Sequence, residues 1–158
     1  MKKLLPLLLV FVIISAVLTI NLNADSTKFF GNFGMMTDDS FNFDFYLWTI
    51  GVNLDFSIND LFMISPDVNV ITYKFEFSTF LLEPAVLANF KLGTFFAGAG
   101  LSKFFIISGS GFGESTDIAL KVNGGFRGDN FKFRVYIITP FTDLFTANII
   151  GATIGIGF

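Results

Sequence analysis

The stretch Asn148–Phe158 reads N-I-I-G-A-T-I-G-I-G-F and ends the sequence. Successive side chains of a β-strand point to opposite faces. One face of this stretch would carry only apolar side chains, namely Ile150, Ala152, Ile154, Ile156 and Phe158. The other would carry only small ones, namely Gly151, Thr153, Gly155 and Gly157. The pattern predicts a final strand with an apolar outer face, a small inner face and an aromatic residue at its end.

The same alternation runs through residues 46–56, 62–70, 118–123 and 131–137. Each of these segments has a row of aromatic and aliphatic side chains on one face. The opposite face carries Thr49, Gly51, Asn53, Asp55, Ser65, Asp67, Asn69, Lys121, Asn123, Lys132, Arg134 and Tyr136. A period of two predicts β-strands rather than helices. The polar and charged residues would therefore all lie on one side of the resulting sheet.

The chain begins with Met1-Lys2-Lys3, continues as an apolar run from Leu4 to Ile20 and reaches Ala24 through a short polar stretch. A basic start, an apolar middle and a small residue at the end predict a secretory signal peptide over residues 1–24. Cleavage after Ala24 would leave a single domain over residues 25–158. A retained membrane anchor is the alternative, although the apolar run is at the short limit for a spanning helix.

The composition excludes several kinds of chemistry. The chain has no cysteine and no histidine, so it has no disulfide, no thiolate metal site and no Ser–His catalytic pair. We expect no catalytic residue, no cofactor and no metal site. Hydrophobic residues make up 53% of the chain, including 24 Phe, yet no apolar run after Ile20 is long enough for a membrane helix. Since backbone in lipid must satisfy its own hydrogen bonds, these strands would form a closed barrel.

Three tight turns recur at near-equal spacing, at residues 57–60, 91–94 and 127–130. Their spacing accommodates two membrane strands of about 9–11 residues each with their connections. This predicts an all-β, eight-stranded antiparallel up-and-down transmembrane β-barrel. With both termini in the periplasm, the three tight turns would be periplasmic. The external connections would be residues 37–40, a poorly marked break within 72–79, a flexible Gly/Ser-rich loop over Ser108–Ser115, and residues 139–143.

Two segments carry a family resemblance. The first runs from Pro84-Ala85-Val86-Leu87 through Phe95-Phe96-Ala97-Gly98-Ala99-Gly100-Leu101, and the second from Asp117-Ile118-Ala119-Leu120 through Gly124-Gly125-Phe126 to the basic strand and the closing strand. Together they resemble the OmpX/OmpA-like family of small bacterial outer-membrane β-barrels. The resemblance covers essentially the whole of residues 25–158. It implies the fold and an outer-membrane location, but it includes no catalytic signature.

A soluble, lipocalin-like barrel is the alternative fold. Such a barrel holds apolar side chains inside around a small ligand and is polar outside. Here Asp67, Lys121, Lys132 and Arg134 share a face with Gly and Asn, opposite continuous apolar rows. A soluble barrel would have to expose those rows or bury those charges without partners, and isolated buried charge is very costly. The membrane barrel is therefore favoured.

The candidate functional residues are five charges on inward positions: Asp67, Glu83, Lys121, Lys132 and Arg134. In one interpretation they form an internal salt-bridge plug, since eight strands leave room for little more than side chains. In the other they line a narrow polar conduit, with inward glycines leaving some space. We expect Lys132 and Arg134 to pair with some of Asp67, Glu83 and Asp117. Phe158, Ile156 and Ile154 are the candidate assembly signal.

Three short motifs are better explained by local structure than by function. Arg127-Gly128-Asp129 spells a cell-adhesion tripeptide, but Gly-Asp in a tight hairpin is turn chemistry. Asp38-Asp39 is most simply a solvated turn. The stretch Gly109–Gly113 lacks the Lys-Ser/Thr that a phosphate-binding loop needs.

We therefore expect a non-enzymatic integral outer-membrane protein of a diderm bacterium with a structural or surface-interaction role. A narrow channel for a small solute is the second hypothesis, and an enzyme without histidine is the third. The expected partners are outer-membrane lipid and the barrel-assembly machinery. Nucleic acid is not expected, because the net charge is −3 and becomes more negative once Lys2 and Lys3 are removed.

Overall fold

The computed structural model describes residues 27–38, 47–109, 111–144 and 148–158. The expected signal peptide, its cleavage site, Asp39 and Tyr46 lie outside the described residues. The strands are β1 (Thr27–Asp38), β2 (Leu47–Ser57), β3 (Phe62–Tyr73), β4 (Thr79–Leu92), β5 (Phe95–Ser102), β6 (Phe105–Ser108), β7 (Gly111–Ser115), β8 (Ala119–Arg127), β9 (Phe131–Pro140) and β10 (Ile149–Gly157). A short 3-10 helix, η2 (Phe141–Asp143), follows β9.

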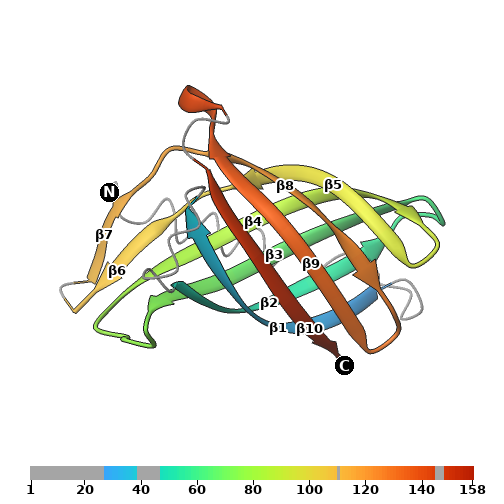
Figure 1. Ribbon diagram of the computed structural model, residues 1–158, viewed down its shortest axis with the longest axis horizontal. Helices are drawn as coiled ribbons and strands as arrows, with labels where there is room; N and C mark the ends of the chain where they lie inside the picture. The colour runs from blue at the N-terminus through green and yellow to red at the C-terminus, as the bar shows by residue number, and fades with distance from the viewer. Residues whose placement is uncertain (1–26, 39–46, 110, 145–147) are drawn as a thin grey trace.

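Eight of these strands close into an antiparallel barrel (Figure 1). The pairing runs β3-β2-β1-β10-β9-β8-β5-β4, and a further pairing of β3 with β4 closes the ring. The first and last strands meet in register, with Phe33 opposite Ile154 and Asp38 opposite Ile149. The predicted fold class, an eight-stranded antiparallel barrel, is confirmed.

All three predicted tight turns are present, and they lie at the end of the barrel where the chain also ends. We call this the turn end and the opposite end the loop end. In the β2–β3 turn, the Asn59 side-chain oxygen accepts hydrogen bonds from the backbone amides of Leu61 and Phe62, each at 2.8 Å. In the β4–β5 turn, Gly93 has a φ of 63°, a conformation that glycine adopts without steric cost.

The loop expected over Ser108–Ser115 is instead part of a hairpin. Strand β6 continues the pairing with β4, with Phe105 opposite Leu82 and Ser108 opposite Thr79. Strand β7 then pairs with β6. The hairpin projects at the loop end, away from the C-terminus (Figure 1). The Gly/Ser composition predicted a flexible loop, but the neighbouring edge of β4 offers backbone partners that composition does not reveal.

The poorly marked β3–β4 connection is a strained turn. Lys74 and Phe75 both have positive φ, at 48° and 62°, and the Glu76 amide donates to the Tyr73 carbonyl at 2.8 Å. This is the type I′ geometry that usually needs Asn-Gly. The left-handed conformation costs about 1–2 kcal/mol for each residue with a side chain. The Phe75 ring stacks 4.8 Å from the Trp48 ring, which offsets about 0.5–1.5 kcal/mol of that cost.

The outer surface of the barrel is apolar, as the alternation predicted. Its exposed side chains include Phe29, Phe33, Ile50, Val52, Phe62, Val68, Val86, Phe90, Val122, Phe126, Phe131, Val135, Ile137, Ile154 and Ile156. Near the turn end several phenylalanines pair with one another across strands, for example Phe62 with Phe90 and Phe126 with Phe131, both at 5.5 Å between ring centroids. A broad apolar outer surface of this kind marks a surface that contacts something other than water.

Among the described residues, no helix has both the length and the apolar character needed to cross a membrane.

The facing of the strands can be tested with neighbouring residues on β5. Gly100 faces inward and lies so close to β4 that an added Cβ would overlap the Val86 carbonyl oxygen, whereas Ala99 is exposed on the outer face. We expect Gly100→Val to reduce the free energy of unfolding by about 1–3 kcal/mol or to prevent folding, since overpacking forces backbone shifts. Ala99→Val should have little effect. Urea unfolding of both refolded variants measures this, and equal tolerance would contradict the assigned facing.

Candidate functional site: the barrel interior

All five charged residues proposed from the sequence lie inside the barrel. Asp67 on β3, Glu83 on β4, Lys121 on β8, and Lys132 and Arg134 on β9 have at most 2% of their surface exposed. Four strands on opposite sides of the ring therefore direct charges of both signs toward the axis. The alternation placed these residues inward, but only the closed barrel brings them into contact.

The first of two ion-pair clusters is centred on Asp67. Arg134 Nη1 lies 2.8 Å from Asp67 Oδ2, and Lys121 Nζ lies 3.1 Å from the same oxygen. Lys121 also contacts Glu83 Oε1 at 2.8 Å. The Asn69 amide donates to the other Glu83 oxygen at 2.9 Å. Two carboxylates and two cations thus bridge β3, β4, β8 and β9.

The second cluster is centred on Asp55, which the list of candidate charges omitted. Lys132 Nζ lies 2.7 and 2.9 Å from its two carboxylate oxygens. Arg127 Nε approaches Asp55 Oδ2 at 3.0 Å from the turn end. Ser65 donates to Asp55 at 2.8 Å. The inward position of Asp55 on β2 was a signal that could have identified it.

The expectation that Asp117 would be an internal partner is wrong. Asp117 is exposed and lies just before β8 begins. Of the other expected pairings, Arg134 pairs with Asp67, whereas Lys132 pairs with Asp55. Alternation assigns a face only within a strand, so a residue beyond the strand end could not be placed by it.

Aromatic rings surround the buried cations. Lys132 Nζ lies 5.0 Å from the Phe96 ring centroid and 5.5 Å from that of Phe30, and both rings are buried. Lys121 Nζ lies 4.6 Å from the centroid of the Tyr136 ring. A cation over an aromatic face is attracted by the ring quadrupole, and the attraction is stronger away from water. Phe30 and Phe96 therefore both stabilise Lys132 and fill the interior near the turn end.

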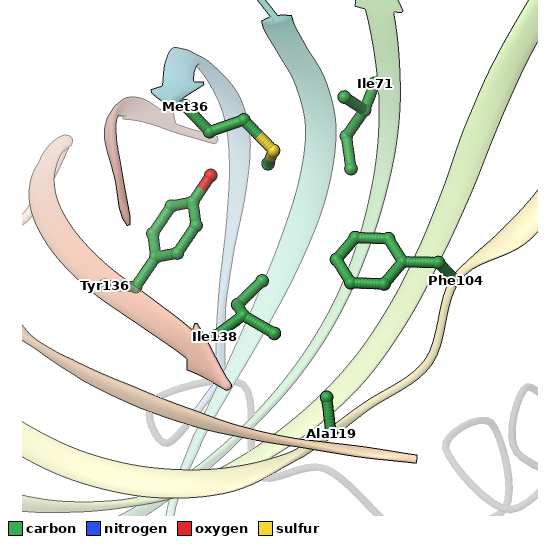
Figure 2. Packing of buried hydrophobic residues seen from close by; sticks show 6 residues of the cluster. All are labelled: Met36, Ile71, Phe104, Ala119, Tyr136 and Ile138. Carbon is green, nitrogen blue, oxygen red and sulfur yellow. The ribbon is translucent and has the colours of Figure 1, made fainter. Parts of the chain in front are cut away.

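Apolar side chains from around the barrel wall point into the interior toward the loop end, and Figure 2 shows six residues of this cluster. It comprises Met36, Leu47, Ile71, Leu81, Phe104, Ala119, Ile138 and Ile149, with Tyr136 packed beside them. Seven of these eight lie on seven different wall strands, and Phe104 lies between β5 and β6. Seven of the eight barrel strands thus contribute one inward apolar residue each, and Phe104 follows the eighth strand, β5. We call this set the apolar ring; the sequence analysis did not identify it, although each of the seven members on a strand follows the inward alternation of that strand.

At two of the inward glycines, neighbouring side chains occupy the space beside the backbone. A Cβ added at Gly151 would lie 2.3 Å from the Tyr136 ring, and one added at Gly51 would lie 2.2 Å from the Asn69 side-chain oxygen. The expectation that these glycines favour free space is therefore wrong at both positions, because a neighbouring large side chain occupies the space that glycine leaves.

Some buried polar atoms have no protein hydrogen-bond partner among the described residues. They include Asp67 Oδ1, Asn89 Oδ1 and both side-chain polar atoms of Asn123. Buried polar groups in folded proteins are normally satisfied, and ordered water is the usual partner where protein groups are lacking. These atoms are hydrogen-bonding groups of the interior that the described side chains leave unused.

Within the described part of the chain, no group of three His, Cys, Asp or Glu residues is arranged to hold a metal ion. The three interior carboxylates are instead paired with Lys121, Lys132, Arg127 and Arg134.

The adhesion-like tripeptide is part of the turn-end structure. Asp129 pairs with Lys28 of β1 at 2.5 Å, and a hydrogen bond from the Lys28 ammonium lowers the pKa of Asp129. Arg127 is turned inward to Asp55, and its side chain is only 16% exposed. The two charged side chains of the tripeptide are thus engaged in different contacts, as expected for a structural turn.

The candidate assembly residues lie on the outer surface at the seam of the barrel. Ile154 and Ile156 are half exposed, and Phe158 is 86% exposed. The Phe158 amide donates to the Phe29 carbonyl at 3.0 Å, and the two rings lie 6.1 Å apart. Their role as an assembly signal remains a prediction.

No family model matches the sequence, and no curated protein matches it. Among solved structures, the N-terminal β-barrel domain of Pseudomonas aeruginosa OprF is 12% identical, with a TM-score of 0.51 over 84% of this chain and 98% of that chain. Neisserial surface protein A has a TM-score of 0.49 at 12% identity, covering 84% and 96%. A de novo designed transmembrane β-barrel scores 0.48 at 9% identity, covering 83% and 95%.

The similarity to the OprF domain concerns the fold alone, because the two sequences are only 12% identical. The chain has the fold of the small, eight-stranded barrels found in outer membranes. The resemblance drawn from the sequence is thus supported at the level of fold.

The ion pairs can be tested by removing one cation. Arg134→Met would remove one of the two cations that contact Asp67 in a buried site, and breaking a buried pair costs about 3–5 kcal/mol. We expect a lower urea midpoint for this variant. Lys28→Met removes a cation from an exposed pair and is the matched control, with little expected effect. If both variants unfolded at the parent's urea concentration, the interior pairs would not be stabilising the barrel.

Proposed function

We propose that this chain is a non-enzymatic integral outer-membrane β-barrel with a structural or surface-interaction role. The observation that carries the proposal is the inverted polarity of the barrel. Paired charges lie in its interior, and an apolar surface covers its outside. Hydrocarbon is the solvent that such a surface matches, and a closed barrel satisfies the backbone hydrogen bonds that lipid cannot.

The location follows from the same polarity together with the predicted signal peptide. We propose export through cleavage after Ala24 and insertion in the outer membrane of a diderm bacterium by its barrel-assembly machinery. The turn end would face the periplasm, and the loop end, with the β6–β7 hairpin, would face outward. Short periplasmic turns and longer external connections are the usual asymmetry of these barrels. Any surface partner would therefore meet the loop end.

The side chains in the interior favour a barrel with a blocked lumen over a barrel that conducts. The apolar ring offers no ligand to a hydrated ion, and apolar constrictions exclude ions by shedding water. Phe30 and Phe96 add apolar bulk beside Lys132 of the second ion-pair cluster. A structural or surface role needs no open lumen, which agrees with this arrangement.

A narrow channel for a small solute is the second candidate. The buried polar atoms that lack protein partners among the described residues favour it, because polar atoms of this kind usually bind water. Conduction would require the apolar ring to open. The two functions therefore differ in the state of that ring.

Membrane insertion can be tested by expressing the full chain in a diderm host. We expect the parent in the outer membrane with Asp25 as its first residue and with a heat-dependent shift on gels. Ile154→Arg should reduce assembly, because Arg facing lipid near the midplane costs about 2–4 kcal/mol. Ile58→Arg is the control, since Ile58 is exposed in a turn at the end of the barrel. An uncut chain in the inner membrane, or equal assembly of both variants, would contradict the proposal.

Conductance in planar bilayers separates the two functions. The parent and Arg134→Met should both be silent, because the apolar ring is intact in each. Replacing Ile71 and Ile138 with Ser would make two positions of the ring polar, and we expect this double variant to show ion currents. Gel mobility before and after heating verifies that each barrel is folded. A steady current through the parent would favour the channel and would contradict the proposal that the lumen is blocked.

A further inference from the structure

An aromatic cluster lies on the outside of the barrel, near the loop end. It consists of Phe33 on β1, Trp48 on β2 and Phe75 in the β3–β4 turn. The Trp48 ring centroid lies 5.5 Å from that of Phe33 and 4.8 Å from that of Phe75. The planes of Phe33 and Phe75 differ by only 1°. The three rings are thus nearly parallel and form one stacked unit, which we call the outer aromatic cluster.

The position of this cluster shows which way the β3–β4 turn folds. Trp48 belongs to the same outward row of β2 as Ile50 and Val52. Since Phe75 stacks on Trp48, the turn lies against the outer wall rather than across the mouth of the barrel. Phe33 and Phe75 remain nearly half exposed, and Phe77 in the same connection is 57% exposed.

The chain holds Phe75 in this place against its backbone preference. Lys74 and Phe75 adopt the left-handed conformation, which an Asn-Gly pair would adopt without strain. Closing the connection therefore does not require these two residues. What they add is a large apolar ring, half covered by Trp48 and half uncovered. A medium that covers the uncovered half would stabilise the turn further.

The height of the outer aromatic cluster along the barrel axis indicates what covers the exposed half of the Phe75 ring. Trp48 and Phe56 mark the two ends of the outward row on β2. At about 3.3 Å per residue and a strand tilt near 40°, they lie about 20 Å apart along the barrel axis. The outward apolar band of a membrane barrel is about 25 Å tall. The outer aromatic cluster therefore lies at the upper edge of this band, where aromatic side chains are concentrated.

We propose that the β3–β4 turn is an interfacial anchor, in which the outer aromatic cluster inserts among the headgroups and first acyl carbons of the outer leaflet. The partner is the lipid surface itself, so the inference rests on the proposed membrane location. The turn carries one charge of each sign, Lys74 and Glu76, so recognition depends on the rings and not on headgroup charge. This external connection is then committed to lipid and is not available to a soluble partner.

Fluorescence offers a direct test, because Trp48 is the single tryptophan of the chain. The protein is refolded in bilayers whose lipids carry bromine at different acyl depths. We expect Trp48 emission to be quenched most by shallow bromines and little by aqueous acrylamide. Phe75→Trp in a Trp48→Phe background should give the same depth. Ile154→Trp in that background reports on the wall and should respond to deeper bromines.

A second variant separates the rings from the turn. Lys74→Asn combined with Phe75→Gly keeps a type I′ turn but removes the ring, and it should at least double acrylamide quenching of Trp48 and shift its emission to the red. The anchor would be overturned if acrylamide quenched both Trp48 and the Phe75→Trp reporter as strongly as in urea while lipid still quenched the wall reporter. That outcome would leave the membrane barrel standing. Failure of lipid to quench the wall reporter would overturn the proposed function, and the anchor with it.

Discussion

Three cations, Lys121, Lys132 and Arg134, are held inside a barrel that is only wide enough for side chains, and the rest of the structure depends on how their charge is balanced. Three carboxylates on the facing strands, Asp55, Asp67 and Glu83, supply that balance. An unpaired charge in such an interior would be very costly, so each cation depends on a carboxylate from a strand that is not its neighbour in the sheet. Because the charges are satisfied inside, the outer surface can be left wholly to apolar side chains.

The interior differs from one end to the other. Phe30 and Phe96 surround Lys132 of the second ion-pair cluster near the turn end, the first cluster bridges opposite walls, and the apolar ring lies toward the loop end. The ion pairs join opposite walls, whereas the proposed role of the apolar ring is to keep ions out. These are separate tasks, and a substitution that weakens one need not affect the other. The alternative channel function depends on the ring alone.

Strand alternation predicted the inward position of every candidate charge, and together with the regular spacing of the three tight turns and the need of backbone in lipid for hydrogen bonds it predicted the barrel. It could not assign ion-pair partners, because pairing depends on which strands face each other across a closed ring. Asp55 was omitted although its inward position on β2 pointed to it, and Asp117 was wrongly included because it lies just before β8, where alternation assigns no face. The β6–β7 hairpin was missed because its Gly/Ser composition resembles a loop, while its pairing partner lies more than twenty residues upstream on β4. The Lys74–Phe75 turn was unmarked because its residues are unusual for its geometry.

The central claim is that polarity is inverted across the barrel wall, and magnetisation transfer from lipid to methyl groups in nanodiscs tests it most directly. Outward methyl groups of Ile50, Val68, Val135 and Ile154 should show cross-peaks to acyl-chain protons. The inward methyl groups of Ile71 and Ile138, which are 1% exposed, should show none. Lipid contacts at the inward methyl groups, or water contacts along the outward rows, would contradict the account.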